Sequence, residues 1–266
     1  MISTYTSYRS TIDNMKQTFD RLFQKPQVKR ETDYYVKHII GVKSVDDFLA
    51  NDKVYSYAMK AYGLEDMIFA KGMIRKVLSD PQYASQLVDK RYQQFAEAFN
   101  FSKYGEKATQ RESAKTVTVN KYMQQTLEVE AGQVNEGTRL ALYFTRTVGG
   151  MVKDNILKEK NWAYQILSDK ALSAVVFKAF NISENVLTSP IESQKSLLES
   201  RMSLKDLQDP KKLEHLIAKF SAMYDVQNQT MINPALMILQ GPNMGGGLAF
   251  SNETIMVLQS FKQGGL

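Results

Sequence analysis

Two acidic segments come closest to a pattern that performs chemistry. Lys43-Ser44-Val45-Asp46-Asp47 and the pair Glu65-Asp66 each place two carboxylates side by side, and paired carboxylates bind cations or move protons. The first segment also fits a capping box, in which a serine and an aspartate satisfy the free amides at a helix start. The second pair follows Gly63 and fits a solvated helix face. We favour these structural roles for both segments.

A glycine-rich loop, Gly241–Gly247, invites comparison with a phosphate cradle. A P-loop places a lysine and a serine or threonine after its last glycine, where they reach phosphate and magnesium. Leu248-Ala249-Phe250 follows here instead. We interpret the loop as a hinge before a terminal segment, since glycine-rich segments behave as flexible chains.

Histidine and cysteine set the limits on metal and nucleophile chemistry. The chain has no cysteine, which excludes disulfides, thiolate nucleophiles and cysteine-ligated metals. We interpret its two histidines, His38 and His215, as satisfied or half-exposed packing residues, the second in an amphipathic helix. No Gly-x-Ser-x-Gly motif of a hydrolase is present. We therefore predict no catalytic, cofactor-binding or metal-binding residues, and a protein that is not an enzyme.

Charge and hydropathy limit the partners. The net charge is +6, and residues 1–125 hold 20 basic against 14 acidic residues while residues 126–266 hold 14 of each. Proteins that bind nucleic acid more usually show a dense stripe of Arg and Lys with interleaved aromatic residues, so we expect no nucleic-acid partner. No apolar run approaches 18 residues and polar residues follow Met1–Tyr5, which predicts neither a membrane span nor a secretory signal. We expect a cytoplasmic protein, or one exported without a cleavable signal.

Two stretches about 117 positions apart resemble each other. Residues 51–64 (NDKVYSYAMKAYGL) are echoed by residues 168–182 (SDKALSAVVFKAFNI). A second phrase, Leu78-Ser79-Asp80-Pro81, returns as Leu207-Gln208-Asp209-Pro210. The order is kept while the spacing drifts, which indicates an old duplication of a helical unit.

Apolar spacing and capping residues predict helices along the whole chain. We expect them over residues 1–30, 31–41, 44–49, 52–63, 65–78, 81–99, 120–148, 153–167, 169–181, 190–200, 203–208 and 210–225, with a short helix or turn at 233–240 and an apolar segment at 255–261. Pro26 is expected to interrupt the first helix, and Gly132 or Gly137 to break the long one. The periodicity is lost over residues 101–121, which we interpret as a linker.

The fold class predicted is therefore all-α, a multihelical body built from two pseudo-repeats with few or no strands. We divide the chain into a first repeat unit with its linker (1–118), a second repeat unit (119–240), and a glycine-rich loop with a C-terminal segment (241–266). The repeats are expected to form one body, although two separate bundles are equally compatible with the spacing.

Several segments resemble the bacterial family known as domain of unknown function 1217. They are residues 43–49 (KSVDDFL), 57–67 (YAMKAYGLEDM), 89–92 (DKRY), 95–101 (FAEAFNF), 135–144 (NEGTRLALYF), 164–172 (YQILSDKAL) and 206–213 (DLQDPKKL). The resemblance covers roughly Tyr5 to Gln240. It implies a multihelical fold and, because genes of the family often lie among flagellar genes, an association with the flagellum. It implies no reaction and no ligand.

Two functions remain open from the sequence. The first is a non-enzymatic helical protein of flagellar assembly or motility, which acts through contacts with a protein partner. The amphipathic segments at both ends of the chain favour this function, because such segments dock onto a body or onto helices of another chain. The alternative is a cytosolic module that binds a ligand or partner in a cleft between the two repeats. The sequence leaves the oligomeric state open.

Overall fold

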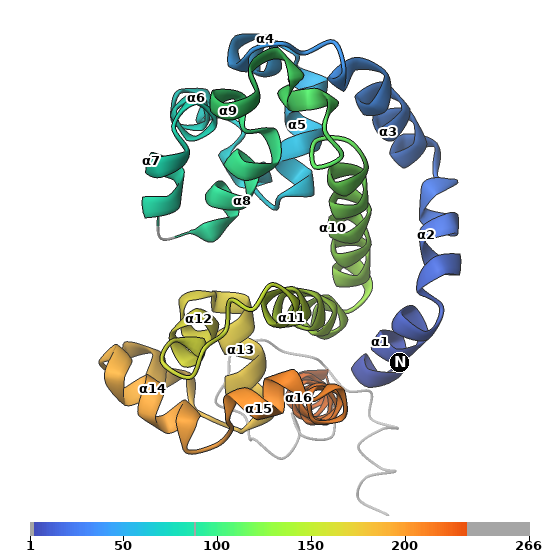
Figure 1. The fold of residues 1–266 in the computed structure, drawn as a ribbon. Coiled ribbons are helices and arrows are strands. Elements are labelled where there is room, and N and C mark those ends of the chain that lie inside the picture. Colours follow the sequence, from blue (N-terminus) through green and yellow to red (C-terminus); the bar gives the residue numbers. More distant parts are fainter. Residues whose placement is uncertain (1–2, 88, 233–266) are drawn as a thin grey trace, which may run out of the picture. The chain divides into compact units, whose positions relative to one another are not determined.

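The computed structural model describes residues 3–87 and 89–232, and this part of the chain is helical without a single strand (Figure 1). The first half contains α1 (Thr4–Asp13), α2 (Met15–Phe23), α3 (Pro26–Ile39), α4 (Val45–Ala50), α5 (Asp52–Ala61), the 3-10 helix η1 (Glu65–Met67), α6 (Lys71–Ser79), α7 (Pro81–Gln86), α8 (Lys90–Phe99), α9 (Phe101–Tyr104) and η2 (Gly105–Gln110). The second half contains α10 (Thr116–Val134), α11 (Glu136–Lys153), α12 (Trp162–Ser168), α13 (Lys170–Ala179), η3 (Glu184–Thr188), α14 (Ile191–Glu199), α15 (Leu204–Gln208) and α16 (Pro210–Ile232). The fold class is the all-α, multihelical one that the sequence predicts.

The chain divides into two compact units, Met1–Asp225 and Val226–Leu266. Every contact described below lies within the first unit. The predicted loop Gly241–Gly247, the short helix or turn expected at 233–240 and the apolar segment at 255–261 lie outside the described residues. The predicted domain boundaries after residues 118 and 240 stay predictions.

The first unit holds two separate groups of buried apolar side chains. The first cluster is formed by α2–α10 and is rich in aromatic rings, whereas the second is formed mainly by α11–α16 and is mostly aliphatic. In the first, Tyr57 stacks between Tyr35 and Tyr122 with ring centroids 4.3 and 3.9 Å away. Aromatic packing of this kind adds stability beyond the area that it buries.

Helices α10 and α11 meet at an elbow and join the two clusters (Figure 1). Asn135 separates them, and its side-chain oxygen caps α11 by accepting the Thr138 amide at 3.0 Å. Across the elbow the buried Glu128 carboxylate accepts two hydrogen bonds from Arg146. Because an unpaired charge is costly away from water, this pair makes the elbow specific for one arrangement of the two helices.

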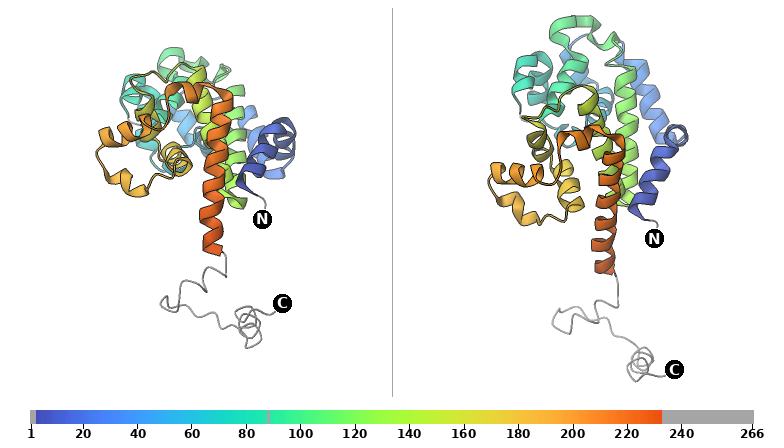
Figure 2. Two further views of the ribbon diagram at one scale, coloured as in Figure 1. Left: turned by 90° about the horizontal axis from the view of Figure 1, so that it is seen from below. Right: turned by 60° about the horizontal axis from the view of Figure 1, so that its bottom comes forward.

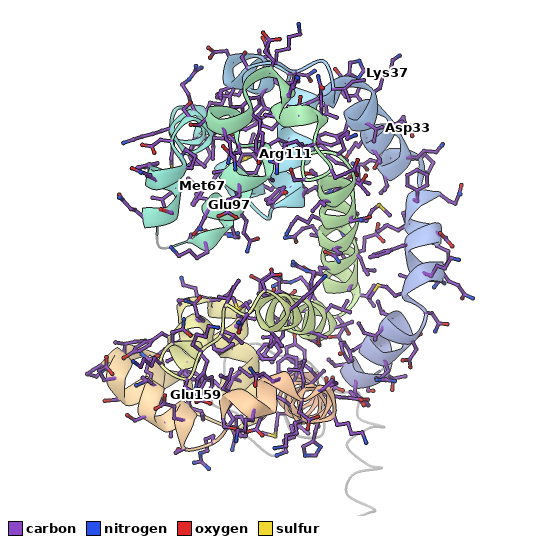
Figure 3. The ribbon with its side chains drawn as sticks, viewed as in Figure 1. Asp33, Lys37, Met67, Glu97, Arg111 and Glu159 are labelled. Carbon is purple, nitrogen blue, oxygen red and sulfur yellow. The ribbon has the colours of Figure 1, made fainter. Side chains whose placement is uncertain are left out.

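The N-terminal helices do not all belong to one cluster. α2 packs on α10 and α3 packs on α5, so both belong to the first cluster (Figures 1 and 2). α1 packs on α11, and its Tyr8 is buried in the second cluster. On the outer face of α3, Asp33 and Lys37 point away from the body (Figure 3).

Several helix boundaries differ from the sequence prediction. The first predicted helix breaks at Asn14, the helix predicted over 81–99 is divided into α7 and α8, and the one predicted over 153–167 begins only at Trp162. Pro26 starts α3 at its first position instead of interrupting a helix, because proline lacks only an amide that has no partner there. Residues 101–110 form α9 and η2, and the buried Ala108 and Thr109 pack this predicted linker into the body. The long helix predicted over 120–148 breaks at Asn135, where the side chain supplies a cap, and not at either glycine.

The first pair of repeated segments forms two equivalent helices. α5 and α13 are both 10 residues long, and each ends in a Schellman motif whose left-handed residue is Gly63 or Asn181. Their buried positions coincide one by one when the numbers are shifted by 118: Val54, Tyr55, Tyr57, Ala58, Met59 and Ala61 match Leu172, Ser173, Val175, Val176, Phe177 and Ala179. The helix caps thus correct the shift of about 117 read from residue identity, while a duplication of the whole unit stays a prediction.

Candidate interaction surfaces

The segment Lys43–Asp47 forms the predicted capping box. The Ser44 hydroxyl accepts the Asp47 amide at 3.1 Å, and the Asp47 carboxylate accepts the Ser44 amide at 3.1 Å. Asp46 forms an ion pair with Arg75 of α6. Asp47 therefore has the helix-start role that the sequence predicts, and Asp46 links α4 to α6.

The two histidines lie apart. The Nδ1 atom of His38 lies 2.7 Å from the Tyr34 carbonyl oxygen one turn earlier, and its ring stacks on the Tyr34 ring at 3.9 Å. A shallow hollow of about 700 Å³ runs from these rings to the start of α5. His215 is exposed on α16. Within residues 3–87 and 89–232, no three His, Asp or Glu side chains are grouped to hold a metal ion.

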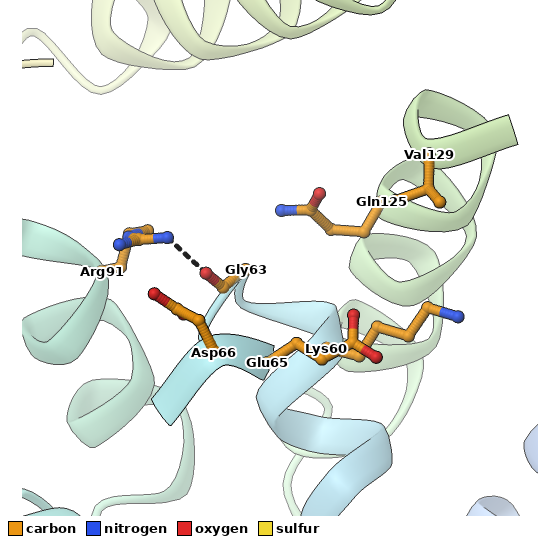
Figure 4. Close-up of a pocket in the computed structure, with 7 residues that line it drawn as sticks. All are labelled: Lys60, Gly63, Glu65, Asp66, Arg91, Gln125 and Val129. Atoms are coloured by element: carbon orange, nitrogen blue, oxygen red, sulfur yellow. Dashed lines mark hydrogen bonds between the residues drawn. The ribbon is translucent and has the colours of Figure 1, made fainter. Parts of the chain in front are cut away.

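The predicted pair Glu65-Asp66 forms part of η1 and lines a cleft of about 440 Å³ (Figure 4). The other lining residues are Lys60, Gly63, Arg91, Gln125 and Val129. These residues come from the end of α5, the start of α8 and the middle of α10. The cleft is open to solvent and holds charges of both signs.

Arg91 in this cleft is held by neighbouring groups. Its guanidinium makes hydrogen bonds of 2.7–3.0 Å to the Asp89 carboxylate and a further one to the Gly63 carbonyl (Figure 4). The hydrogen bonds that Arg91 donates to Asp89 raise the pKa of Arg91. Partial burial opposes the ionised form of Asp89, but the same bonds still lower the pKa of Asp89. Arg91 thereby ties the start of α8 to the C-cap of α5.

The turn after α5 exposes a large aromatic side chain. Phe69 is 81% exposed, which is unusual for a phenylalanine in a folded body. Met67 on η1 is half-buried close by (Figure 3). A ring left in water loses the free energy that burial would give it, so Phe69 is a candidate contact residue when its backbone is held in place.

The backbone around Phe69 is fastened on both sides. The Tyr55 hydroxyl donates to the Ile68 carbonyl at 3.0 Å, and the Lys71 ammonium binds the Leu49 carbonyl at 3.0 Å and the Asp52 carboxylate at 2.7 Å. Burial raises the pKa of Tyr55 to about 12, so this hydroxyl keeps its proton in the neutral range. Phe69 is therefore presented from an ordered turn.

The turn after α13 has the same character. Leu187 is 49% exposed and Ile191 is 45% exposed, at the end of η3 and the start of α14. The buried Gln194 side chain donates to the Leu187 carbonyl at 3.2 Å and to the Ser189 carbonyl at 2.8 Å. Two equivalent helices are thus followed by two fastened turns that expose apolar side chains.

Sequence reasoning missed both turns. Phe69 belongs to the apolar run Met67-Ile68-Phe69-Ala70, and each of these residue types is common in a protein core. The signal that was available is Gly63, the left-handed residue after the C-cap of α5, because a chain leaving a capped helix runs over the surface before the next helix begins.

Comparison with known proteins gives two matches. Residues 61–213 match the family model described as Protein of unknown function (DUF1217). The crystal structure of protein AGR_C_984 from Agrobacterium tumefaciens is similar, with 40% sequence identity, a TM-score of 0.73, and coverage of 86% of this chain and 97% of that one. Among curated proteins none matches. Residues 3–87 and 89–232 contain no candidate membrane-spanning helix.

Proposed function

The chain belongs to the family described as Protein of unknown function (DUF1217), and we propose that it is a non-enzymatic helical protein of bacterial flagellar assembly or motility. It works through contacts with a protein partner. The flagellar part of the proposal rests on the occurrence of family genes among flagellar genes. The contact part rests on the structure of the two turns.

The observation that supports a contact function best is Phe69 on its fastened turn. Energetically dominant interface residues are enriched in aromatic anchors that enter a partner's pocket. Binding costs less when the anchor's backbone is already ordered, because little conformational entropy is lost on association. Leu187 and Ile191 offer a second apolar contact of the same construction. The partner that fits is an apolar pocket or helix face of another protein.

The experiment begins with deletion of the gene in a flagellated host, scored for swimming and for filament assembly. We expect both to be impaired, and unchanged motility would overturn the flagellar part of the proposal. Affinity capture from cytosol and from medium, made separately, then identifies the partner and its compartment.

The contact surface is tested by complementation with Phe69→Ser. Val134→Ser is the matched control, because Val134 is also an exposed apolar residue, at 89%, but stands at the end of α10. We expect Phe69→Ser to abolish partner capture and the control to retain it. Equal capture by both variants would remove Phe69 from the interface.

The second candidate function is a cytosolic module that binds a small ligand in the cleft beside Gly63. Its support is the cleft itself, where Lys60, Glu65 and Asp66 offer both charge signs to a polar ligand. A thermal-shift screen with metabolites tests this function. Val129→Trp adds a large ring to the lining of the cleft, so a true ligand should stabilise the parent chain more than this variant.

A further inference from the structure

Helix α1 lies in a groove that belongs to the second cluster. The groove is formed by the start of α11 and by α16 up to Asp225, whereas α2 and α3 pack on the first cluster. α1 therefore docks on the half of the body that lies furthest from it along the sequence. Its contacts fall into two groups, one at its N-terminal end and one along its length.

The groove recognises the N-terminal end of α1. The Asp225 carboxylate accepts the Thr4 amide at 3.0 Å and also the Thr4 hydroxyl. The Asn135 amide at the elbow donates to the same hydroxyl at 3.0 Å. A carboxylate at this position complements the positive end of the helix dipole. Gly137 lets the helices approach closely, because a Cβ there would lie 2.6 Å from the Tyr224 ring and 2.9 Å from the Thr4 methyl group.

Further along α1 the recognition is by hydroxyl groups and charge. Glu214 of α16 accepts hydrogen bonds from the Tyr5 hydroxyl at 3.0 Å and from Arg9 at 2.7 Å. The hydroxyls of Tyr8 and Thr145 lie 3.0 Å apart. The groove is thus acidic where it meets the helix, and it fits a helix that begins with a hydroxyl residue and has tyrosines and an arginine at fixed spacing.

The interface is suited to release. Tyr8 is the one large side chain of α1 that is fully buried. Tyr5 and Ile12 pack against the second cluster while only partly buried, and the remaining contacts are polar pairs that water can replace. A single non-helical residue, Asn14, separates α1 from α2 and supplies a pivot. Release of α1 would expose a groove whose complement exists on every copy of the chain.

We propose that α1 is an exchangeable arm, and that the groove of α11 and α16 accepts α1 from a second copy of this chain. Exchange of an identical element forms a dimer at low cost, because every contact of the closed chain is made again between two chains. This self-association uses neither Phe69 nor the cleft, so it stands or falls independently of the function proposed above.

The absence of cysteine from the chain makes the test clean, because only introduced thiols react. Arg9→Cys protein is mixed at high concentration with Glu214→Cys protein, incubated with gentle warming, and treated with a short bifunctional maleimide. Positions 9 and 214 face each other when α1 is docked. Each chain in this mixture carries only one of the two thiols, so a link between these positions forms only across two chains. The matched control replaces Glu214→Cys by Gln94→Cys, an exposed residue of α8. A chain that carries both Arg9→Cys and Glu214→Cys is treated in the same way at high dilution. An internal link in this chain shows that α1 still docks.

The expected result is a covalent dimer from the 9/214 mixture, well above the 9/94 control and increasing with concentration. Adding Asp225→Lys to the Glu214→Cys chain should reduce that product roughly fivefold or more, the factor that a favourable helix-end charge is worth. Failure of the 9/214 mixture to exceed the control, while the doubly substituted chain links internally, would overturn the exchange. A product that is insensitive to Asp225→Lys would also overturn it.

Discussion

Helices α5 and α13 share a frame, by which we mean their length, caps and buried positions. They differ in the side chains that occupy those buried positions. Both have an Asx N-cap, 10 residues, six buried positions in the same places and a left-handed residue after the C-cap. The inward faces differ most at two positions, where Tyr55 and Tyr57 of α5 match Ser173 and Val175 of α13. The frame is set by local capping chemistry, which tolerates very different side-chain volumes inside it.

The difference in filling changes how each following turn is held. In the first half, the Tyr55 hydroxyl reaches out of α5 to fasten the turn that exposes Phe69. Ser173 is too short for that role, and Gln194 of α14 fastens the second turn from the opposite side. The same outcome, an ordered turn with exposed apolar side chains, is thus reached by two constructions.

The largest effect is expected from emptying the matched core positions. Tyr57→Ala should lower the free energy of unfolding by about 3–5 kcal/mol, since it removes a buried ring and leaves a cavity. It also removes the stack with Tyr35 and Tyr122 and the contact of its hydroxyl with Thr32. Val175→Ala should cost only about 2 kcal/mol, because fewer carbon atoms are lost. Denaturant titration measures both, and equal losses would show that the tyrosine stack adds nothing.

The left-handed residues give the next largest effect. Gly63→Ala should cost about 1–2 kcal/mol, because its φ of +67° is unfavourable for a residue with a Cβ. The new Cβ would also lie 2.7 Å from the Gln125 side-chain nitrogen. Asn181→Gly at φ +52° should be neutral or stabilising by less than about 1 kcal/mol.

Thermal unfolding of the two variants checks this pair. The contrast in sign is the diagnostic, since both positions have the same role in a Schellman motif. Destabilisation by Asn181→Gly as large as that by Gly63→Ala would mean that the Asn181 side chain has a role of its own and that the two caps are not equivalent.

Local chemistry explains which parts of this fold were predictable. The Asp80-Pro81 and Asp209-Pro210 junctions start α7 and α16, and both aspartates accept amides of the first turn. These starts follow from neighbouring residues alone. Six residues after Pro81 the chain leaves the helix, whereas α16 continues to Ile232, and that difference depends on packing.

What the sequence missed depends on residues far apart in the chain. The long helix breaks at Asn135, whose side chain contacts Thr4, 131 positions away in the sequence. No local sequence pattern indicates that contact. The exposure of Phe69 could not be predicted for a related reason, because its sequence neighbours are apolar residues of the kind found in a core. Residue identity also aligned Asn51 with Ser168, whereas the caps align it with Asp169.

The two fastened turns can be tested separately by removing the side chain that donates a hydrogen bond to each of them. Tyr55→Phe should cost about 1 kcal/mol, the usual contribution of one hydrogen bond, and should speed amide exchange around Phe69. Gln194→Leu should speed exchange around Leu187 and leave the first turn unchanged. Hydrogen-exchange mass spectrometry measures both turns in one experiment. Faster exchange in both turns with either variant would show that they are not held independently.

The smallest effect is expected at the capping boxes, which the two halves use at different places. Asp47 accepts the Lys43 and Ser44 amides before α5, whereas Asp206, after α14, accepts the Ser203 amide and the Lys212 ammonium. The hydrogen bond from Lys212, followed by those from Ser203, lowers the pKa of Asp206 from 3.8 to about 2.

A depressed pKa in the folded state means that the ionised Asp206 stabilises the fold above about pH 4, and that this stability is lost as the pH falls toward 2. Lys212→Met should therefore move the Asp206 pKa upward and flatten the loss of stability between pH 4 and pH 2. The effect is small because solvent screens this pair, and salt should weaken it further. Carboxyl-detected NMR titration follows the residue directly. An unchanged pKa in Lys212→Met would assign the shift to the Ser203 amide and hydroxyl, and the two capping boxes would then be alike.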